Sequence, residues 1–94
     1  MVRETKAKAQ KLLKAMGDAS NVIASLSAHS VAVKTVTLVG SRPVIRVERC
    51  GYCDALIHEG RAAYLEFGCG VSGKYRQGQY LVGGCKVIWS ESLH

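Results

Sequence analysis

The first 28 residues carry apolar side chains at alternating steps of three and four positions. This spacing places the apolar positions on one face of an α-helix, so the pattern predicts a helix over residues 2–28. Gly17-Asp18 interrupts the middle, and Asp18 or Ser20 could cap a second helix. One kinked helix and two short helices both fit. The expected buried stripe is Val2, Thr5, Ala9, Leu12, Met16, Ala19, Ile23 and Leu26.

The next segment changes to a strand pattern. Residues 30–39 are rich in β-branched side chains and have apolar groups at odd and even positions, which predicts a central strand covered on both faces. Residues 40–43 have the composition of a turn. After the turn, Ile45 and Val47 point one way and Arg46 points the other. The sequence therefore predicts a hairpin with one buried face and one solvent-exposed face that carries Arg46.

The pattern is weaker between residues 54 and 67. This segment contains good helix formers and a possible cap, but Gly60 lies in its middle, where glycine weakens a helix. We interpret it as two strands, 55–59 and 62–67, joined by a turn, and a helix is the alternative. The choice between the two is close.

The last third of the chain is rich in glycine. Residues 68–79 predict a loop or a hairpin tip, and residues 80–89 predict a strand with a bulge or bend at Gly83-Gly84. Ninety-four residues suffice for one small domain, and the 48% apolar content is typical of a globular chain. We therefore expect one α+β domain over 1–94. A basic helical segment, 1–28, would pack on a mostly antiparallel sheet of three to five strands within 30–94.

The net charge of +6 is unevenly distributed. Residues 1–14 contain five cations and one glutamate. Residues 31–49 contain four cations and one glutamate, and residues 50–69 are mildly acidic. Two positive regions suit a nucleic acid or an acidic protein surface. A solvated basic helix face is the alternative. The candidate anion-binding cations here are Lys6, Lys8, Lys11, Lys14, Arg42 and Arg46.

A further candidate contact lies in the glycine-rich segment 71–80. It interleaves Lys74 and Arg76 with Tyr75, a composition that holds phosphates and stacks bases. The glycine and lysine spacing is not that of a P-loop. A solvated hairpin tip is the alternative, and both roles are compatible because hairpin tips often carry contacts.

Four cysteines, Cys50, Cys53, Cys69 and Cys85, are separated by two, fifteen and fifteen residues. Free cysteine is among the most buried residue types, so we expect small apolar core residues first. Four thiolates could also close one structural zinc site, with His58 or His29 as a possible replacement ligand. The third alternative is dithiol redox chemistry at Cys50 and Cys53.

Two local resemblances support these alternatives. The strand 44–49 entering Cys50-Gly51-Tyr52-Cys53 resembles the first half of a zinc ribbon, which implies a bound zinc ion. The "CGYC" letters also look like a glutaredoxin-type motif. That resemblance implies a strand, the motif and then a helix whose N-terminus lowers the first thiol's pKa.

No segment predicts a membrane span or a signal peptide. The most apolar stretch, residues 22–40, contains Lys34, His29 and several hydroxyls. We therefore expect a cytoplasmic, reducing location without structural disulfides. The adjacent His58 and Glu59 lack any supporting catalytic group nearby in the sequence. We expect no catalysis.

These observations predict a small non-enzymatic binding or regulatory protein that contacts a nucleic acid or another anionic partner, without a cofactor or with one structural zinc. The first alternative is a phage- or mobile-element-type accessory protein that binds and modulates a host protein. The second is a thiol-disulfide oxidoreductase at Cys50 and Cys53. The oligomeric state does not follow from the sequence.

Overall fold

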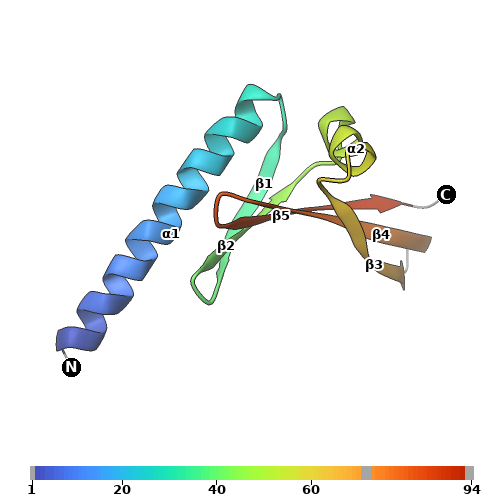
Figure 1. Ribbon diagram of the computed structural model, residues 1–94. Helices are drawn as coiled ribbons and strands as arrows, with labels where there is room; N and C mark the ends of the chain where they lie inside the picture. Colours follow the sequence, from blue (N-terminus) through green and yellow to red (C-terminus); the bar gives the residue numbers. More distant parts are fainter. Residues whose placement is uncertain (1, 71–72, 93–94) are drawn as a thin grey trace.

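The computed structural model describes residues 2–70 and 73–92, and the side chains within them except at 2–7, 66–67 and 69–70 (Figure 1). Within these residues, two helices accompany one five-stranded sheet. Their bounds are α1 (Val2–Ala28), β1 (Val33–Val39), β2 (Arg42–Val47), α2 (Gly51–His58), β3 (Ala63–Gly70), β4 (Gly73–Val82) and β5 (Cys85–Ser92).

The strand order is β1-β2-β5-β4-β3, and neighbouring strands are antiparallel except for the parallel pair β2 and β5. The N-terminal helix packs on this sheet, mainly against β2 and β1. The predicted α+β fold, with a basic helix on a mostly antiparallel sheet, is therefore confirmed. The sheet has five strands, within the expected range of three to five.

The N-terminal segment forms one continuous helix that passes through Gly17 without a break. The helix ends where Ser30 adopts a left-handed conformation with φ of +61°. The Val31 N–H then donates to the Leu26 carbonyl and the Ser30 N–H to the Ser27 carbonyl, each at 3.0 Å, which completes a Schellman motif. Of the two alternatives, the single helix is correct.

The buried stripe of α1 differs from the predicted one in its first half. Leu26 and Ala19 are buried as expected, but Leu12 and Met16 are 46% and 57% exposed. The buried apolar residues of α1 are Ala15, Ala19, Val22 and Leu26. The difference arises because Leu12 and Met16 lie to one side of the buried stripe, towards the edge strand β1, where no further strand of the described chain covers them. Figure 1 shows α1 crossing this end of the sheet.

The hairpin formed by β1 and β2 was predicted correctly, but the place of β1 in the sheet was not. Ile45 and Val47 are buried on the helix-covered face as expected. Residues 30–39 were expected to form a central strand, whereas β1 is an edge strand with six of its seven residues exposed. Abundant β-branched residues favour a strand at either place, so composition did not distinguish edge from centre.

Residues 51–58 form α2, which corrects the expected strand over 55–59. Leu56 and Cys53 give this helix its buried side. Gly60 lies just after the helix, with φ of +75°. There the Arg61 N–H donates to the Leu56 carbonyl at 2.9 Å, so the glycine ends the helix and does not interrupt it. The second expected strand, 62–67, is confirmed within β3.

Residues 80–89, expected as one bent strand, form parts of β4 and β5 joined by a two-residue turn. Gly83 and Gly84 have φ values of +56° and +79°. Two consecutive positive φ angles are the requirement of the tight hairpin turns that follow the twist of a sheet. This turn returns the chain so that β5 lies at the centre of the sheet, beside β2.

Both helices bury side chains in one cluster on the same face of the sheet. At its centre, the fully buried Trp89 lies over Gly78, where an added Cβ would be 2.3 Å from the indole ring. His29 stacks on Tyr52 with ring centroids 4.3 Å apart, which joins the end of α1 to the start of α2. In the described part of the chain no helix covers the opposite face, which we call the open face.

Candidate anion-binding groove

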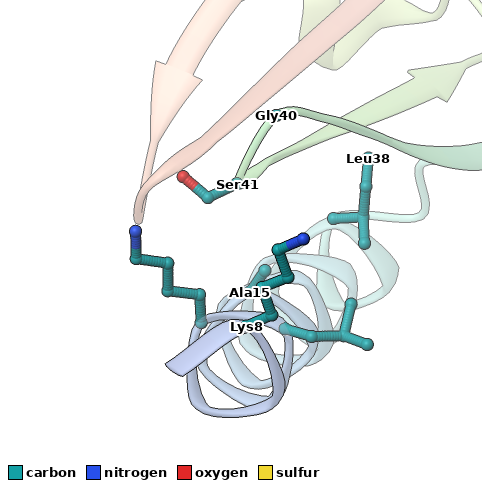
Figure 2. Close-up of a pocket in the computed structure, with 7 residues that line it drawn as sticks. Lys8, Ala15, Leu38, Gly40 and Ser41 are labelled. Carbon is teal, nitrogen blue, oxygen red and sulfur yellow. The ribbon is translucent and has the colours of Figure 1, made fainter. Parts of the chain in front are cut away.

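A groove runs between α1 and the β1–β2 and β4–β5 turns (Figure 2). It consists of two adjoining hollows of about 430 and 350 Å³, which share Lys11, Ala15 and Ser41. We call this feature the α1 groove. Its lining residues are Lys8, Lys11, Leu12, Lys14, Ala15, Asp18, Leu38, Gly40, Ser41, Arg42 and Gly84.

The helical spacing of α1 explains how its lysines reach the groove. Lys8, Lys11 and Ala15 are separated by three and four positions, so they lie along one side of the helix. Ala15 is small and buried, and it lies on the groove side of the helix, two turns after Lys8 (Figure 2). Leu38 points towards α1 from the sheet side (Figure 2). The result is a groove with an apolar floor and cations along its margin.

The charge of the α1 groove is strongly positive. Four cations line the groove, and Asp18 is the single carboxylate among the described lining residues. Asp18 accepts a 3.0 Å hydrogen bond from the Lys14 Nζ one helical turn away. An exposed ion pair of this kind contributes little to stability, because both partners are largely solvated. The remaining cations are Lys8, Lys11 and Arg42, so the groove can attract anionic groups.

The structure separates the other predicted anion-binding residues from this groove. Lys6 lies on α1, and its side chain is outside the described residues. Arg46 is in register with Ile88 on the open face. Lys74 and Tyr75 are exposed near the start of β4, at the end of that strand away from the Gly83-Gly84 turn.

Arg76 is the predicted anion-binding residue with the most extensive internal contacts. Its Nη2 lies 3.1 Å from the Glu91 carboxylate, and its guanidinium lies 3.8 Å from the centre of the Tyr64 ring. These contacts occupy the charge and one face of the guanidinium. The structure therefore brings Lys8, Lys11, Lys14 and Arg42 together, and it gives Arg76 a place within the folded sheet.

The sequence analysis missed the buried carboxylate of Glu91. It accepts hydrogen bonds from the Tyr64 hydroxyl at 2.7 Å, the Trp89 indole at 3.0 Å and Arg76. Burial opposes its ionisation, but these hydrogen bonds outweigh burial and hold the pKa of Glu91 below its usual range. The signal was available, since Val87, Trp89 and Glu91 are alternate positions of one strand.

Cys50 and Cys53 lie together where β2 leads into α2. Their Sγ atoms are 3.9 Å apart, and Cys50 is the N-cap residue of the helix. Burial raises the pKa of the Cys53 thiol to about 11. Cys85 is also buried, and burial raises the pKa of its thiol. The cysteines at 53 and 85 thus belong to the apolar core, as the first interpretation expected.

The register of the sheet does not bring the four cysteines to one point. Cys69 is opposite Lys74, whereas Cys85 is opposite Val82. Eight residues of extended chain separate those two positions of β4, a distance of about 26 Å. Within the part of the chain that the structure describes, no three histidine, cysteine or acidic side chains are grouped as for a metal ion. Zinc binding stays a prediction.

Comparison with known proteins gives a family match over nearly the whole chain. A family model described as "Uncharacterised protein" matches residues 1–92. The chain belongs to this family. No curated protein and no solved structure matches it.

The helices of this family member are too polar or too short for a membrane span in the part of the chain that the structure describes. Among the described residues, neither α1 nor α2 is long and apolar enough to cross a bilayer. The N-terminal half of α1 has lysines at 8, 11 and 14, which a hydrocarbon environment would strongly disfavour.

Proposed function

We propose that this protein is a small non-enzymatic binding protein that holds an anionic macromolecule in the α1 groove, with a nucleic acid as the first partner class to test. One observation carries the proposal. Lys8, Lys11, Lys14 and Arg42 come from two separate segments, yet they line the same groove beside a single described carboxylate. If the lysines only kept one face of α1 solvated, there would be no reason for Arg42, which comes from a separate segment, to lie in the same groove.

The charge of the groove determines how such binding should depend on salt. Each phosphate that a cation neutralises releases condensed counterions from a nucleic acid, which makes affinity fall as salt rises. Four groove cations would give a slope of log affinity against log salt of about −3 to −4 on double-stranded DNA. A carboxylate-rich protein would also bind more weakly in salt, because screening weakens exposed charge pairs.

The test is fluorescence anisotropy with labelled single- and double-stranded oligonucleotides and labelled poly-glutamate, at 50 and 200 mM salt. Lys11→Glu reverses the cation that both parts of the groove share. Lys86→Glu is the matched control, since Lys86 is in register with Val44 on the open face. We expect Lys11→Glu to weaken binding at least tenfold and Lys86→Glu less than threefold. Equal effects, or no binding of any probe at 50 mM salt, would contradict the proposal.

The cysteine pair supports a second candidate, thiol-disulfide exchange at Cys50 and Cys53. The strand, the Cys-x-x-Cys motif and α2 follow in the order that such a site requires, and the thiols are 3.9 Å apart. The Cys50 thiolate would attack a substrate disulfide and form a mixed disulfide, which releases the first substrate thiol. The Cys53 thiolate would then attack the Cys50 sulfur and release the second substrate thiol. Cys50 and Cys53 would thereby become a disulfide, while the substrate gains two thiols.

An insulin-reduction assay with dithiothreitol as the final reductant tests this candidate. Cys50→Ser removes the attacking sulfur, and Cys85→Ser is the control, because Cys85 lies on β5 and not beside the pair. Activity that survives in Cys50→Ser, or is absent in the unsubstituted protein, would exclude this chemistry.

A further inference from the structure

The outer edge of β1 is open for pairing. Within residues 2–70 and 73–92, β1 pairs only with β2, so its other row of backbone N–H and C=O groups has no strand beside it. Natural edge strands are commonly short, covered or heavily charged, which prevents unwanted pairing. β1 is seven residues long and exposes the apolar side chains of Val36, Leu38 and Val39, with Lys34 as its charged residue.

The apolar residues of β1 beneath α1 lie on the helix-covered face. Val36 is in register with the buried Ile45, and Leu38 is in register with the buried Pro43. Side chains that are opposite each other in a register project from the same face of the sheet. Val36 and Leu38 are nevertheless 44% and 40% exposed, because no element beyond β1 in the described chain covers them.

The exposed apolar residues of α1 face the same edge. Asp18 and Lys14 line the part of the α1 groove beside Gly84, on the β5 side of β2. The 100° helical step places Leu12 and Met16 on the other side of the buried stripe, and β1 lies on that side of β2. A strand added beside β1 would therefore place alternate side chains between α1 and the sheet. We call Leu12, Met16, Val36 and Leu38 the apolar edge.

Charge identifies the kind of segment that this edge fits. From Lys8 to Val47 the sequence has six lysines and arginines and one acidic residue, Asp18. A second copy of the chain would bring Lys8, Lys11 and Lys34 towards cations of their own kind, which is repulsive. A nucleic acid has neither the backbone donors of a strand nor apolar side chains for the edge.

We infer that the β1 edge binds an extended acidic segment of another protein as a sixth strand. Main-chain hydrogen bonds to β1 supply affinity, and alternate apolar side chains contact the apolar edge. Glutamates that alternate with these apolar side chains project to the open face, where Arg46 is in register with Thr35 of β1. This inference rests on the proposed function and specifies its partner class, an acidic protein segment whose apolar side chains adjoin the α1 groove at Leu12 and Leu38.

The test uses a labelled ten-residue peptide in which valine alternates with glutamate, and fluorescence anisotropy with the full chain. Met16→Glu places a carboxylate on the apolar edge, and we expect it to weaken peptide binding at least tenfold. Leu13→Glu is the matched control, because the adjacent Leu13 is 67% exposed and lies away from the sheet side of α1. We expect less than a twofold effect there.

Backbone methylation of the peptide tests strand addition directly. A strand directs alternate N–H groups to opposite sides, so only one of the two alternating sets can donate to β1. Methylating that set should abolish binding, and methylating the other should leave affinity within about threefold, because those groups face solvent. Equal loss with both sets, or no loss with either, would overturn strand addition.

Two further results distinguish this inference from the proposed function. Lys11-dependent oligonucleotide binding without peptide binding would overturn the strand proposal and leave the proposed function standing. A dimer in sedimentation that Met16→Glu dissociates, with no peptide binding, would assign the edge to a second copy and overturn the inference. If neither the peptide nor any polyanion binds, both proposals fail.

Discussion

The Trp89 indole N–H donates a 3.0 Å hydrogen bond to the Glu91 carboxylate, two residues further along β5. The Tyr64 hydroxyl of β3 donates to the same oxygen at 2.7 Å, and Arg76 of β4 pairs with the other. One buried carboxylate thus joins the three strands at the end of the sheet away from the Gly83-Gly84 turn. Its hydrogen bonds are charge-assisted, which makes them stronger than neutral ones.

Glu91→Gln should lower the free energy of unfolding by about 1–3 kcal/mol at pH 7, because it removes the charge that accepts these hydrogen bonds. The pKa of Glu91 is lowered in the folded state, so its contribution is present above the unfolded pKa. The contribution is lost as the pH falls through the folded value. The difference in free energy of unfolding between the unsubstituted protein and Glu91→Gln should therefore shrink below about pH 4.5.

Urea denaturation at pH 7 and pH 3 measures this difference. Glu59→Gln is the control, since Glu59 is exposed and pairs only with the exposed Arg61 among the described residues. We expect it to change the free energy of unfolding by less than about 0.5 kcal/mol. A Glu91→Gln effect that is as large at pH 3 as at pH 7 would contradict the assigned role.

Two glycine substitutions should have opposite effects. Gly78→Ala places a methyl group 2.3 Å from the buried Trp89 ring, and we expect a loss of about 1–3 kcal/mol from overpacking. Gly17→Ala meets nothing within 4 Å on α1 and should stabilise the protein by about 0.5–1 kcal/mol. Urea denaturation followed by Trp89 fluorescence compares them. Loss of stability in both variants would count against the α1 assignment at Gly17.

Ser30→Gly should increase stability, because Ser30 has a φ of +61° at the end of α1. A non-glycine residue in this conformation carries a cost of about 1 kcal/mol, part of which the flexibility of glycine in the unfolded chain offsets. We expect a net gain of about 0.5 kcal/mol in thermal or urea denaturation. Ser27→Gly within the helix is the control and should lower stability. A loss in Ser30→Gly would argue against the Schellman motif.

Cys53 and Cys85 should resist thiol reagents in the folded protein. Both are buried, and a pKa of about 11 at Cys53 leaves roughly a hundredfold less thiolate at neutral pH than its ordinary value of 9.0 would. Iodoacetamide labelling at pH 7.5, followed by peptide mass spectrometry, should modify the half-exposed Cys50 before Cys53 and Cys85. Labelling of Cys53 at the rate of Cys50 in the native protein would contradict this burial.

The sequence predicted elements that depend on local spacing. The 3.6-residue periodicity gave α1, and alternation gave the buried positions Ile45 and Val47. Two errors involve glycines. Gly60 was interpreted as an argument against a helix in residues 54–67, and Gly83-Gly84 was interpreted as a bend within one strand, whereas each of these glycines has a positive φ and lies just beyond the end of an element. A Gly-Gly pair between two apolar runs is a recognised hairpin signal, so β4 and β5 could have been separated.

The order of the strands could not be predicted in the same way. The edge position of β1 follows from the pairing of β2 with β5, which are separated by α2, β3 and β4. The candidate groove was predicted in part, since Lys8, Lys11 and Arg42 were expected to bind anions. That these residues meet, while Arg46 lies on the open face, depends on how α1 crosses the sheet.

The central position of β5 has a consequence for how this chain folds. Val87 is in register with Ile45, and the chain between them includes a helix and two other strands. On the ribosome, β5 is made after the other four strands, so Ile45 and Val47 lack their strand neighbour until then. Closing so long a loop is slow compared with forming α1. We expect α1 and the first hairpin to await residues 85–92 before they acquire stable tertiary structure.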